Sequence, residues 1–188
     1  MKKISLLLFC FTNLFFSCAP IPSSNMKTDM SHFKKEGMIA GTLSLEDKRL
    51  MSDYTLRYVQ IESGASKNRF SDMLNEKKTD FIYNPGEVKF GYSEGDFKEG
   101  DKDVYLFNIV QTAGKYRIYE LNIFHNSGSQ LNQYKHKVPV DITFEIEDGK
   151  IKYLGEINIS IKDQETKLIN NIERDRVKFK EKNPNITF

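Results

Sequence analysis

Two stretches near the C-terminus alternate strictly between apolar and polar residues, and this pattern constrains the fold more than any other feature. The first stretch covers residues 138–146 and the second covers residues 151–161. A period of two is typical of a strand with one buried face. Between them lies Glu147-Asp148-Gly149-Lys150, and Asp-Gly is a preferred two-residue hairpin turn because both positions need positive φ. The pattern therefore predicts an antiparallel hairpin.

This hairpin would place Asp141 opposite Glu156 on its polar face. Like charges in directly opposed positions destabilise a sheet, so the two carboxylates could bind a divalent cation or share a proton. The alternative is that Gly155, which has no side chain, forms a β-bulge that turns Glu156 away. We favour the bulge, and we keep Asp141 and Glu156 as candidate binding residues.

Further strands are expected through most of the chain after residue 36. A run that is apolar on both faces predicts a central strand covered on both sides, and Asn84-Pro85-Gly86 predicts a turn. In the strand that starts at Tyr116 the apolar phase slips between Ile118 and Tyr119, which predicts a bulge or kink. The expected strands are residues 38–45, 54–61, 81–83, 88–92, 104–110 (the central one) and 116–124.

The C-terminal region is expected to contain one more strand and a helix. Residues 166–172 suit either a strand or the start of a helix, and residues 173–182 form a charged helical segment that Asn183-Pro184 would end. We favour a strand followed by a helix. The sum is eight or nine strands with one or two short helices. This composition predicts a mainly β fold, a single antiparallel β-sandwich of immunoglobulin or transthyretin type over residues 37–188.

The N-terminus has the order of parts found in an export signal. Two lysines precede an apolar run over residues 4–16, which is too short for a stable membrane span. The run ends in Ser17-Cys18, with Phe15 where Leu is usual, and it resembles the signal of a bacterial lipoprotein. The resemblance implies that residues 1–17 are removed and that Cys18 receives the acyl chains.

An acylated Cys18 would place the protein in the bacterial cell envelope. Residues 18–36 would then be the lipidated cysteine and a flexible tether, opening with Ala-Pro-Ile-Pro-Ser-Ser. Ala19 after the cysteine favours the outer membrane, at its periplasmic face or at the cell surface, by analogy with other lipoproteins. Attachment would be through acyl chains on Cys18, and multiple chains anchor firmly.

Charge and cysteine content exclude several classes of function. The 28 basic residues include Lys2 and Lys3, so removal of the signal leaves 26 basic against 26 acidic residues. This balance gives no reason to expect nucleic acid as a partner. Of the two cysteines, Cys10 leaves with the signal and Cys18 carries lipid. No thiol remains for a disulfide, a zinc site or a nucleophile.

The charged segment 94–103 is a second candidate binding region. It holds five acidic residues between glycines, which suggests calcium. However, it lacks the ligand spacing of an EF-hand, and two lysines interrupt it. A solvated loop is the favoured interpretation, and Asp96, Glu99 and Asp101 remain candidate binding residues.

The three histidines give little support for catalysis or metal binding. His32 lies in the tether, and His136 lies between two lysines. His125 lies near Ser127 and Ser129, which could be part of a hydrolase triad, but no Gly-x-Ser-x-Gly elbow accompanies them. We therefore predict no catalytic residue and no metal site.

The segment Gly149-Lys150-Ile151-Lys152-Tyr153-Leu154-Gly155-Glu156-Ile157, read with a final helix ending at Pro184, resembles the closing hairpin of small bacterial envelope lipoproteins. That uncharacterised β-sandwich family implies an architecture and no activity. We expect a non-enzymatic binding or interaction module whose loops or sheet edge contact an envelope or host protein. A module that binds a small ligand or a divalent metal is the alternative, and an envelope hydrolase is the least favoured. No cofactor is expected.

Overall fold

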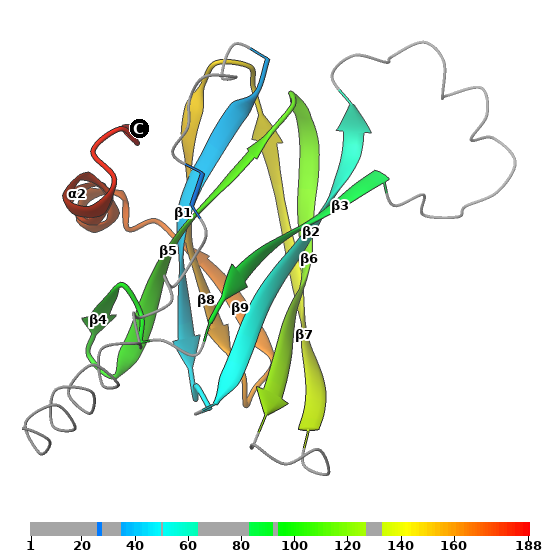
Figure 1. The fold of residues 1–188 in the computed structure, drawn as a ribbon, viewed down its shortest axis with the longest axis vertical. Helices are drawn as coiled ribbons and strands as arrows, with labels where there is room; N and C mark the ends of the chain where they lie inside the picture. Colours follow the sequence, from blue (N-terminus) through cyan, green and yellow to red (C-terminus); the bar gives the residue numbers. More distant parts are fainter. Residues whose placement is uncertain (1–25, 28–34, 50, 64–82, 92–93, 127–132) are drawn as a thin grey trace, which may run out of the picture.

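The computed structural model describes residues 26–27, 35–49, 51–63, 83–91, 94–126 and 133–188. Within these residues nine strands form two sheets, and one helix follows them (Figure 1). The mainly β sandwich with a C-terminal helix is thereby confirmed. The elements are β1 (Gly37–Glu46), β2 (Ser52–Ser63), β3 (Tyr83–Phe90), β4 (Phe97–Glu99), β5 (Lys102–Gln111), β6 (Gly114–Asn126), β7 (Gln133–Ile146), β8 (Ile151–Ser160), β9 (Glu165–Ile169) and α2 (Ile172–Lys182).

The two sheets face each other in the body of the molecule (Figure 1). Sheet A has the strand order β4-β5-β1-β8-β9, and sheet B has the order β3-β2-β6-β7. β1 pairs antiparallel with β5 and parallel with β8, so that the first strand lies at the centre of sheet A. The helix α2 lies on the side of sheet A that faces away from sheet B.

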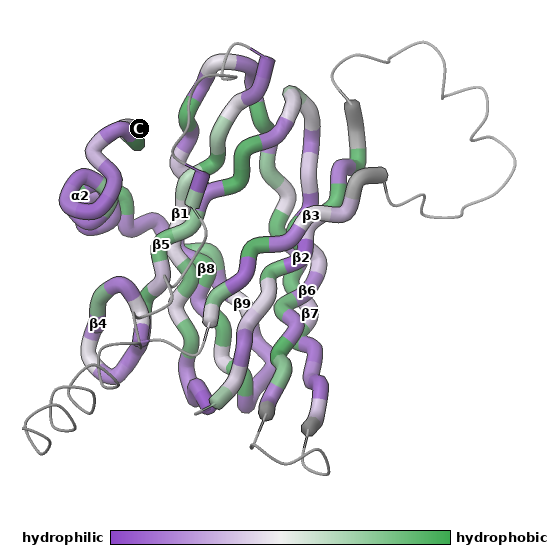
Figure 2. Tube along the Cα trace, in the orientation of Figure 1, coloured by the Kyte–Doolittle hydropathy of each residue, from purple (hydrophilic) through white to green (hydrophobic). Residues whose placement is uncertain are grey.

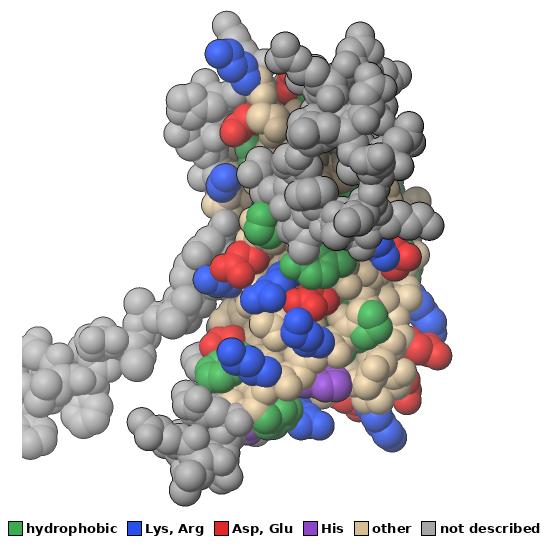
Figure 3. All heavy atoms as spheres, turned by 90° about the vertical axis from the view of Figure 1, so that its right-hand side faces the viewer, with side chains coloured by type: hydrophobic (Ala, Val, Ile, Leu, Met, Phe, Trp, Pro, Cys, Tyr) green, Lys and Arg blue, Asp and Glu red, His purple; other side chains and the backbone are tan. Residues whose placement is uncertain are grey.

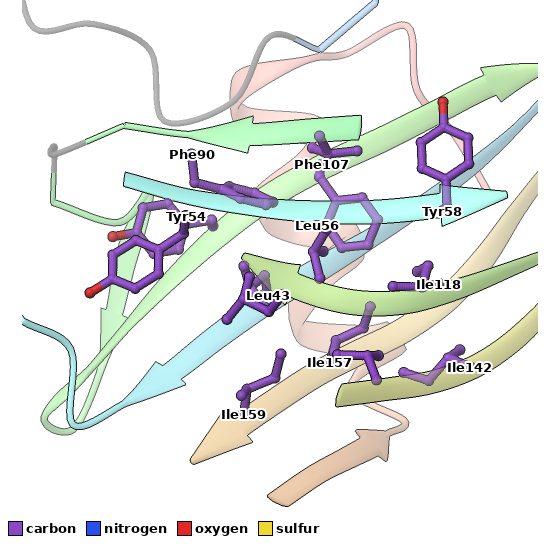
Figure 4. Close-up of a cluster of buried hydrophobic side chains, with 14 of the residues drawn as sticks. Leu43, Tyr54, Leu56, Tyr58, Phe90, Phe107, Ile118, Ile142, Ile157 and Ile159 are labelled. Atoms are coloured by element: carbon purple, nitrogen blue, oxygen red, sulfur yellow. The ribbon is translucent and has the colours of Figure 1, made fainter. Parts of the chain in front are cut away.

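The main core fills the space between the sheets. Leu43 and Ile157 from sheet A meet Leu56 and Ile118 from sheet B, and all four side chains are completely buried (Figure 4). A smaller apolar cluster lies on the outer face of sheet A, where Leu106 of β5 packs near Phe179 of α2. Residues 104–110 of β5 are buried on both faces, as predicted for a central strand. Period-two patterning thus builds both layers.

The predicted hairpin between residues 138–146 and 151–161 is wrong. β7 pairs with β6 in sheet B, whereas β8 pairs with β1 and β9 in sheet A. Residues 147–150 therefore cross from one sheet to the other. The physical reason is that alternation buries one face of each strand, and that face is satisfied equally by a strand alongside or by a strand across the core. Of the two central turn residues only Gly149 has positive φ, at 68°.

Both predicted irregularities are confirmed. The pairing register of β6 shifts at Tyr119 against both of its neighbours. β8 has a bulge at Leu154–Gly155, where Gly155 adopts a φ of +125°. Because the bulge inverts the phase of β8, Tyr153 and Glu156 share the outer face of sheet A, while Ile157 points into the core.

Two further expectations concern the strand ends. Asn84-Pro85-Gly86 does not turn the chain, because β3 continues through it to Phe90. β3 is an edge strand, and the missing N–H of a proline is tolerated at an edge. The predicted strand followed by a helix near the C-terminus is confirmed by β9 and α2. In the part of the chain that the structure describes, no helix is long and apolar enough to cross a membrane.

Candidate functional site

A cluster of buried charges lies between α2 and the outer face of sheet A. Glu156 of β8 is 2% exposed and Asp175 of α2 is fully buried. Arg174 lies between them, with its Nη2 at 2.7 Å from Glu156 Oε2 and at 2.6 Å from Asp175 Oδ1. A buried carboxylate costs free energy unless it is paired and hydrogen-bonded. One arginine therefore compensates both carboxylates.

Neutral side chains also donate hydrogen bonds to each carboxylate. Glu156 accepts hydrogen bonds from Ser44 Oγ and from Asn171 Nδ2, the latter at 2.5 Å. Asp175 Oδ2 accepts from Thr42 Oγ1 at 2.8 Å and from Tyr153 Oη at 2.6 Å. These donors come from β1, β8 and the residue before α2. The cluster therefore ties the helix to two strands of sheet A.

The surroundings of the cluster keep Glu156 and Tyr153 in one protonation state at neutral pH. Burial by itself raises the pKa of Glu156, but hydrogen bonds from Ser44, Asn171 and Arg174 outweigh it and hold that pKa below its ordinary value. Burial and the hydrogen bond to Asp175 raise the pKa of Tyr153. At neutral pH the carboxylate stays ionised and the phenol stays protonated. This arrangement suits structural pairing and not proton transfer.

The structure does not bring the two candidate carboxylates Asp141 and Glu156 together. Asp141 is exposed on β7, where Arg117 Nε donates to its Oδ1 at 2.8 Å. Glu156 lies in the other sheet, beneath α2. The conflict of like charges rested on the hairpin that does not form. Figure 3 shows the side on which sheet B lies in Figure 1, where basic and acidic side chains are intermingled.

The acidic residues of the segment 94–103 hold a short hairpin to the helix. Asp96 Oδ1 accepts from Lys182 Nζ at 2.5 Å, and its Oδ2 accepts from the N–H of Leu106 at 2.8 Å. Glu99 pairs with Arg174, whose guanidinium also lies over the ring of Phe97. The segment expected to be only a solvated loop thus contains the strand β4.

The remaining predicted residues take no part in a shared site among the described residues. Asp101 is exposed at the turn between β4 and β5. His125 lies 3.1 Å from Ser52 Oγ, while Ser127 and Ser129 lie outside the described residues. Cys18 also lies outside them. Where the chain is described, no group of three or more His, Cys, Asp or Glu side chains could hold a metal.

The second feature of interest is an open strand edge. β8 pairs with β1 from Ile151 to Ser160, but β9 covers its other side only from Glu156 to Ser160. The chain leaves sheet A after Ile169 and turns into α2. In the described structure no strand lies beside Ile151–Gly155 on that side. Half of the backbone hydrogen-bonding groups of an edge face outward, so this stretch can accept another strand.

A groove of about 640 Å³ runs beside the open edge. Leu168 and Ile169 of β9 form part of its wall and are 50% and 38% exposed. Lys152 lies at the groove and pairs with Glu147. The lining residues are Ile151, Lys152, Tyr153, Leu154, Gly155, Leu168, Ile169, Asn170, Ile172 and Phe188. The groove is thus mainly apolar, and one of its walls is an unpaired stretch of strand.

Sequence reasoning missed the residues that define both features. It identified Glu156 but not its partner Arg174, which lies 18 residues away on a helix whose packing was unknown. It also left Leu168 and Ile169 in a segment that suited either a strand or a helix start. The bulge at Gly155 was the available signal, because a bulge often marks where strand pairing ends.

The known proteins that resemble this chain do so at low sequence identity. No family model matches the chain. A stretch of 108 residues is 24% identical to Neural-cadherin of Drosophila melanogaster, a match that spans 57% of this chain and 4% of that protein. The crystal structure of a leucine-rich repeat protein from Bacteroides thetaiotaomicron matches with 13% identity and a TM-score of 0.36. That match covers 68% of this chain and 14% of the other.

Proposed function

We propose that this protein is a lipid-anchored, non-enzymatic binding module of the bacterial envelope that holds an extended segment of a partner protein along β8. Acyl chains on Cys18 attach it to the outer membrane, as the N-terminal signal implies. The observation that carries the proposal is the open edge of residues 151–155 beside an apolar groove.

Strand addition explains both parts of this site. The backbone of an added strand supplies the hydrogen bonds that an edge lacks, and pockets for alternate side chains supply specificity. Lysines and bulges limit unwanted pairing at an edge, and this edge has Lys152 and the bulge at Leu154–Gly155, so an added strand would have to fit both. Here the edge is flanked by the exposed side chains of Leu168 and Ile169. An occupant with apolar side chains at alternate positions would bury them.

The size of the groove agrees with this use. Its volume of about 640 Å³ lies within the roughly 300–1,000 Å³ that is usual for ligand sites. Gly155 lines the groove but is itself buried against Leu168 and Ile169, so an occupant would contact the strand at residues 151–154. The alternative, a ligand or divalent-cation module using Asp141 and Glu156, gains no support, because each of these carboxylates pairs with an arginine.

The test uses a displayed library of ten-residue peptides selected against the domain and then measured individually. We expect the selected peptides to slow amide hydrogen exchange of residues 151–155 and to leave sheet B unchanged. A Leu168→Lys substitution should weaken binding at least tenfold, since it places a charge in the apolar wall. The matched control is Thr143→Lys, at an exposed position of β7, which should bind as the wild type does.

Backbone chemistry separates strand addition from simple apolar contact. Methylation of alternate peptide nitrogens removes the donors that pair with an edge, while the side chains stay the same. We expect the methylated peptides to lose binding. Failure to select any peptide, equal binding by the Leu168→Lys variant, or full binding by methylated peptides would overturn the proposal.

A further inference from the structure

The segment before β1 is fixed to sheet A at Lys27, ten residues before that strand begins. The side-chain amide of Asn108, on the outer face of β5, contacts the backbone of Lys27 twice. Lys27 N–H donates to Asn108 Oδ1 at 3.0 Å, and Asn108 Nδ2 donates to the carbonyl oxygen of Lys27 at 2.7 Å. Asn108 is only 7% exposed. Both backbone groups of one residue are held, as a neighbouring strand would hold them.

Apolar packing strengthens this attachment. Met26 packs against the cluster that contains Leu106 of β5 and Phe179 of α2. Its Sδ lies 3.8 Å from Asn183 Nδ2, just after the helix. If the segment left the sheet, the buried amide of Asn108 would lose both backbone partners and keep only the sulfur of Met38, which is costly. The chain is therefore held between β5 and α2 at Met26–Lys27.

This attachment shortens the connection to a lipidated Cys18. Eight residue steps separate Cys18 from Met26, which span at most about 28 Å when fully extended. A tether that ran freely to Gly37 would have 19 steps and could reach about 65 Å. The shorter reach starts from the outer face of sheet A, on the side where α2 lies (Figure 1). A tether of this reach favours a bilayer on the α2 side, with sheet B turned away.

The exposed surface of α2 has the chemistry to meet an anionic bilayer. Val177 is 55% exposed on the helix, and most of the helix is hydrophilic (Figure 2). Outside the buried cluster the helix carries four basic residues, Arg176, Lys178, Lys180 and Lys182, against Glu173 and Glu181. Lys182 also pairs with Asp96 of the β4–β5 hairpin, so the face keeps an excess of one basic charge. Basic residues near anionic lipid each contribute attraction. By contrast, the side of sheet B mixes the two signs (Figure 3).

We infer that the α2 face lies against the bilayer surface, with anionic lipid headgroups as its partner. The inference rests on the proposed lipid anchor and adds the orientation of the domain. It leaves sheet B facing away from the membrane. Two features set this orientation: the attachment of Met26 and Lys27 at Asn108, and the basic residues on α2.

The test exploits the absence of tryptophan from the chain. The chain from Cys18 onward contains every described residue and a single thiol, which can be coupled to a maleimide lipid in vesicles. One variant carries Val177→Trp on α2 and the matched variant carries Thr143→Trp on β7. Vesicles of phosphatidylcholine and phosphatidylglycerol carry a spin-labelled headgroup that quenches nearby tryptophan. We expect quenching at position 177 to be at least threefold stronger than at position 143.

Two further measurements make the result decisive. Asn108→Leu should reduce the difference between the two positions, because it releases Met26 and Lys27. Quenching at position 177 should also increase with the phosphatidylglycerol fraction. Equal quenching at both positions, or stronger quenching at position 143, would overturn the orientation, and no response to phosphatidylglycerol would overturn the anionic partner. Chemical coupling keeps this result independent of lipidation in cells and of peptide binding.

Discussion

At the scale of single residues, the pairing of Glu156 with Arg174 compensates a carboxylate that is almost completely buried. We predict that Glu156→Gln lowers the free energy of unfolding by about 2–4 kcal/mol at pH 7, because it leaves a half-buried guanidinium with one partner fewer. Asp141→Asn is the matched control, since it also removes a carboxylate that faces an arginine. Asp141 is exposed, so its loss should cost less than about 1 kcal/mol. Urea titration of both variants checks the difference.

The wild type and the Glu156→Gln variant should also differ in how their stability depends on pH. The pKa of Glu156 in the folded state lies below the ordinary value of 4.5. A depressed pKa means that the carboxylate stabilises the fold fully above that ordinary value, and that this contribution is lost as the pH falls through the folded pKa. The stability gap between the wild type and Glu156→Gln should therefore narrow below pH 4.5. A gap that widened in acid would contradict the assigned charge state.

Sequence reasoning at the residue scale identified Glu156 for an incorrect reason. It took the residue as half of a carboxylate pair with Asp141, because it assumed that two alternating strands joined by Asp-Gly pair with each other. The polar face of β8 is instead covered by α2, whose Arg174 and Asp175 come from later in the chain. A single sequence contains no signal for such contacts between distant segments, since each partner looks like an ordinary surface charge.

At the scale of elements, most strands and both bulges could be predicted, whereas the partner of β8 could not. Alternation and phase slips are local properties, so they reveal the strand around Tyr119 and the bulge at Gly155. Partner choice depends on which sheet each strand joins, and apolar alternation suits either choice. β8 joins β1, more than 100 residues earlier in the chain. No local sequence pattern indicates that parallel pairing.

The bulge of β8 gives a prediction at the scale of elements. Gly155 has a φ of +125°, and an added Cβ would lie 2.9 Å from Leu168 Cδ1 and 3.0 Å from the carbonyl oxygen of Ile169. We predict that Gly155→Ala lowers stability by about 2–3 kcal/mol. Gly100→Ala is the control, because Gly100 also has a positive φ but no atom within 4 Å of the added Cβ. It should cost about 1 kcal/mol.

Thermal or urea unfolding of the two glycine variants measures this difference. Backbone strain and the close contact of β8 with β9 both make the loss at Gly155 larger, because a φ of +125° lies outside the left-handed region near +59° that other residues can adopt. A Gly155→Ala protein as stable as Gly100→Ala would show that β9 can move away from the bulge without cost. In that case the wall formed by Leu168 would be adjustable and not fixed.

At the scale of the whole molecule, the described parts form three layers: sheet B, sheet A and α2. The buried charges of Glu156 and Asp175 join α2 to sheet A, and Asp96 joins the helix to the β4–β5 hairpin. The open edge of β8 lies beside the start of α2. With the α2 face on the bilayer, the groove would lie close to the membrane surface. The partner segment would then belong to an envelope protein that reaches the same membrane surface.

Membrane attachment itself is predicted to depend on one atom, the sulfur of Cys18. Each buried methylene of an acyl chain contributes about 0.8 kcal/mol to membrane binding, so loss of the thiol removes the whole anchor. We predict that Cys18→Ser moves the protein from the membrane fraction to the soluble fraction. Its melting temperature should not change, because Cys18 lies outside the described fold. Cys10→Ser is the matched control, since under the proposal Cys10 would leave with the signal, and its loss should leave the protein on the membrane. A Cys18→Ser protein that still sediments with membranes after a carbonate wash would require another means of attachment.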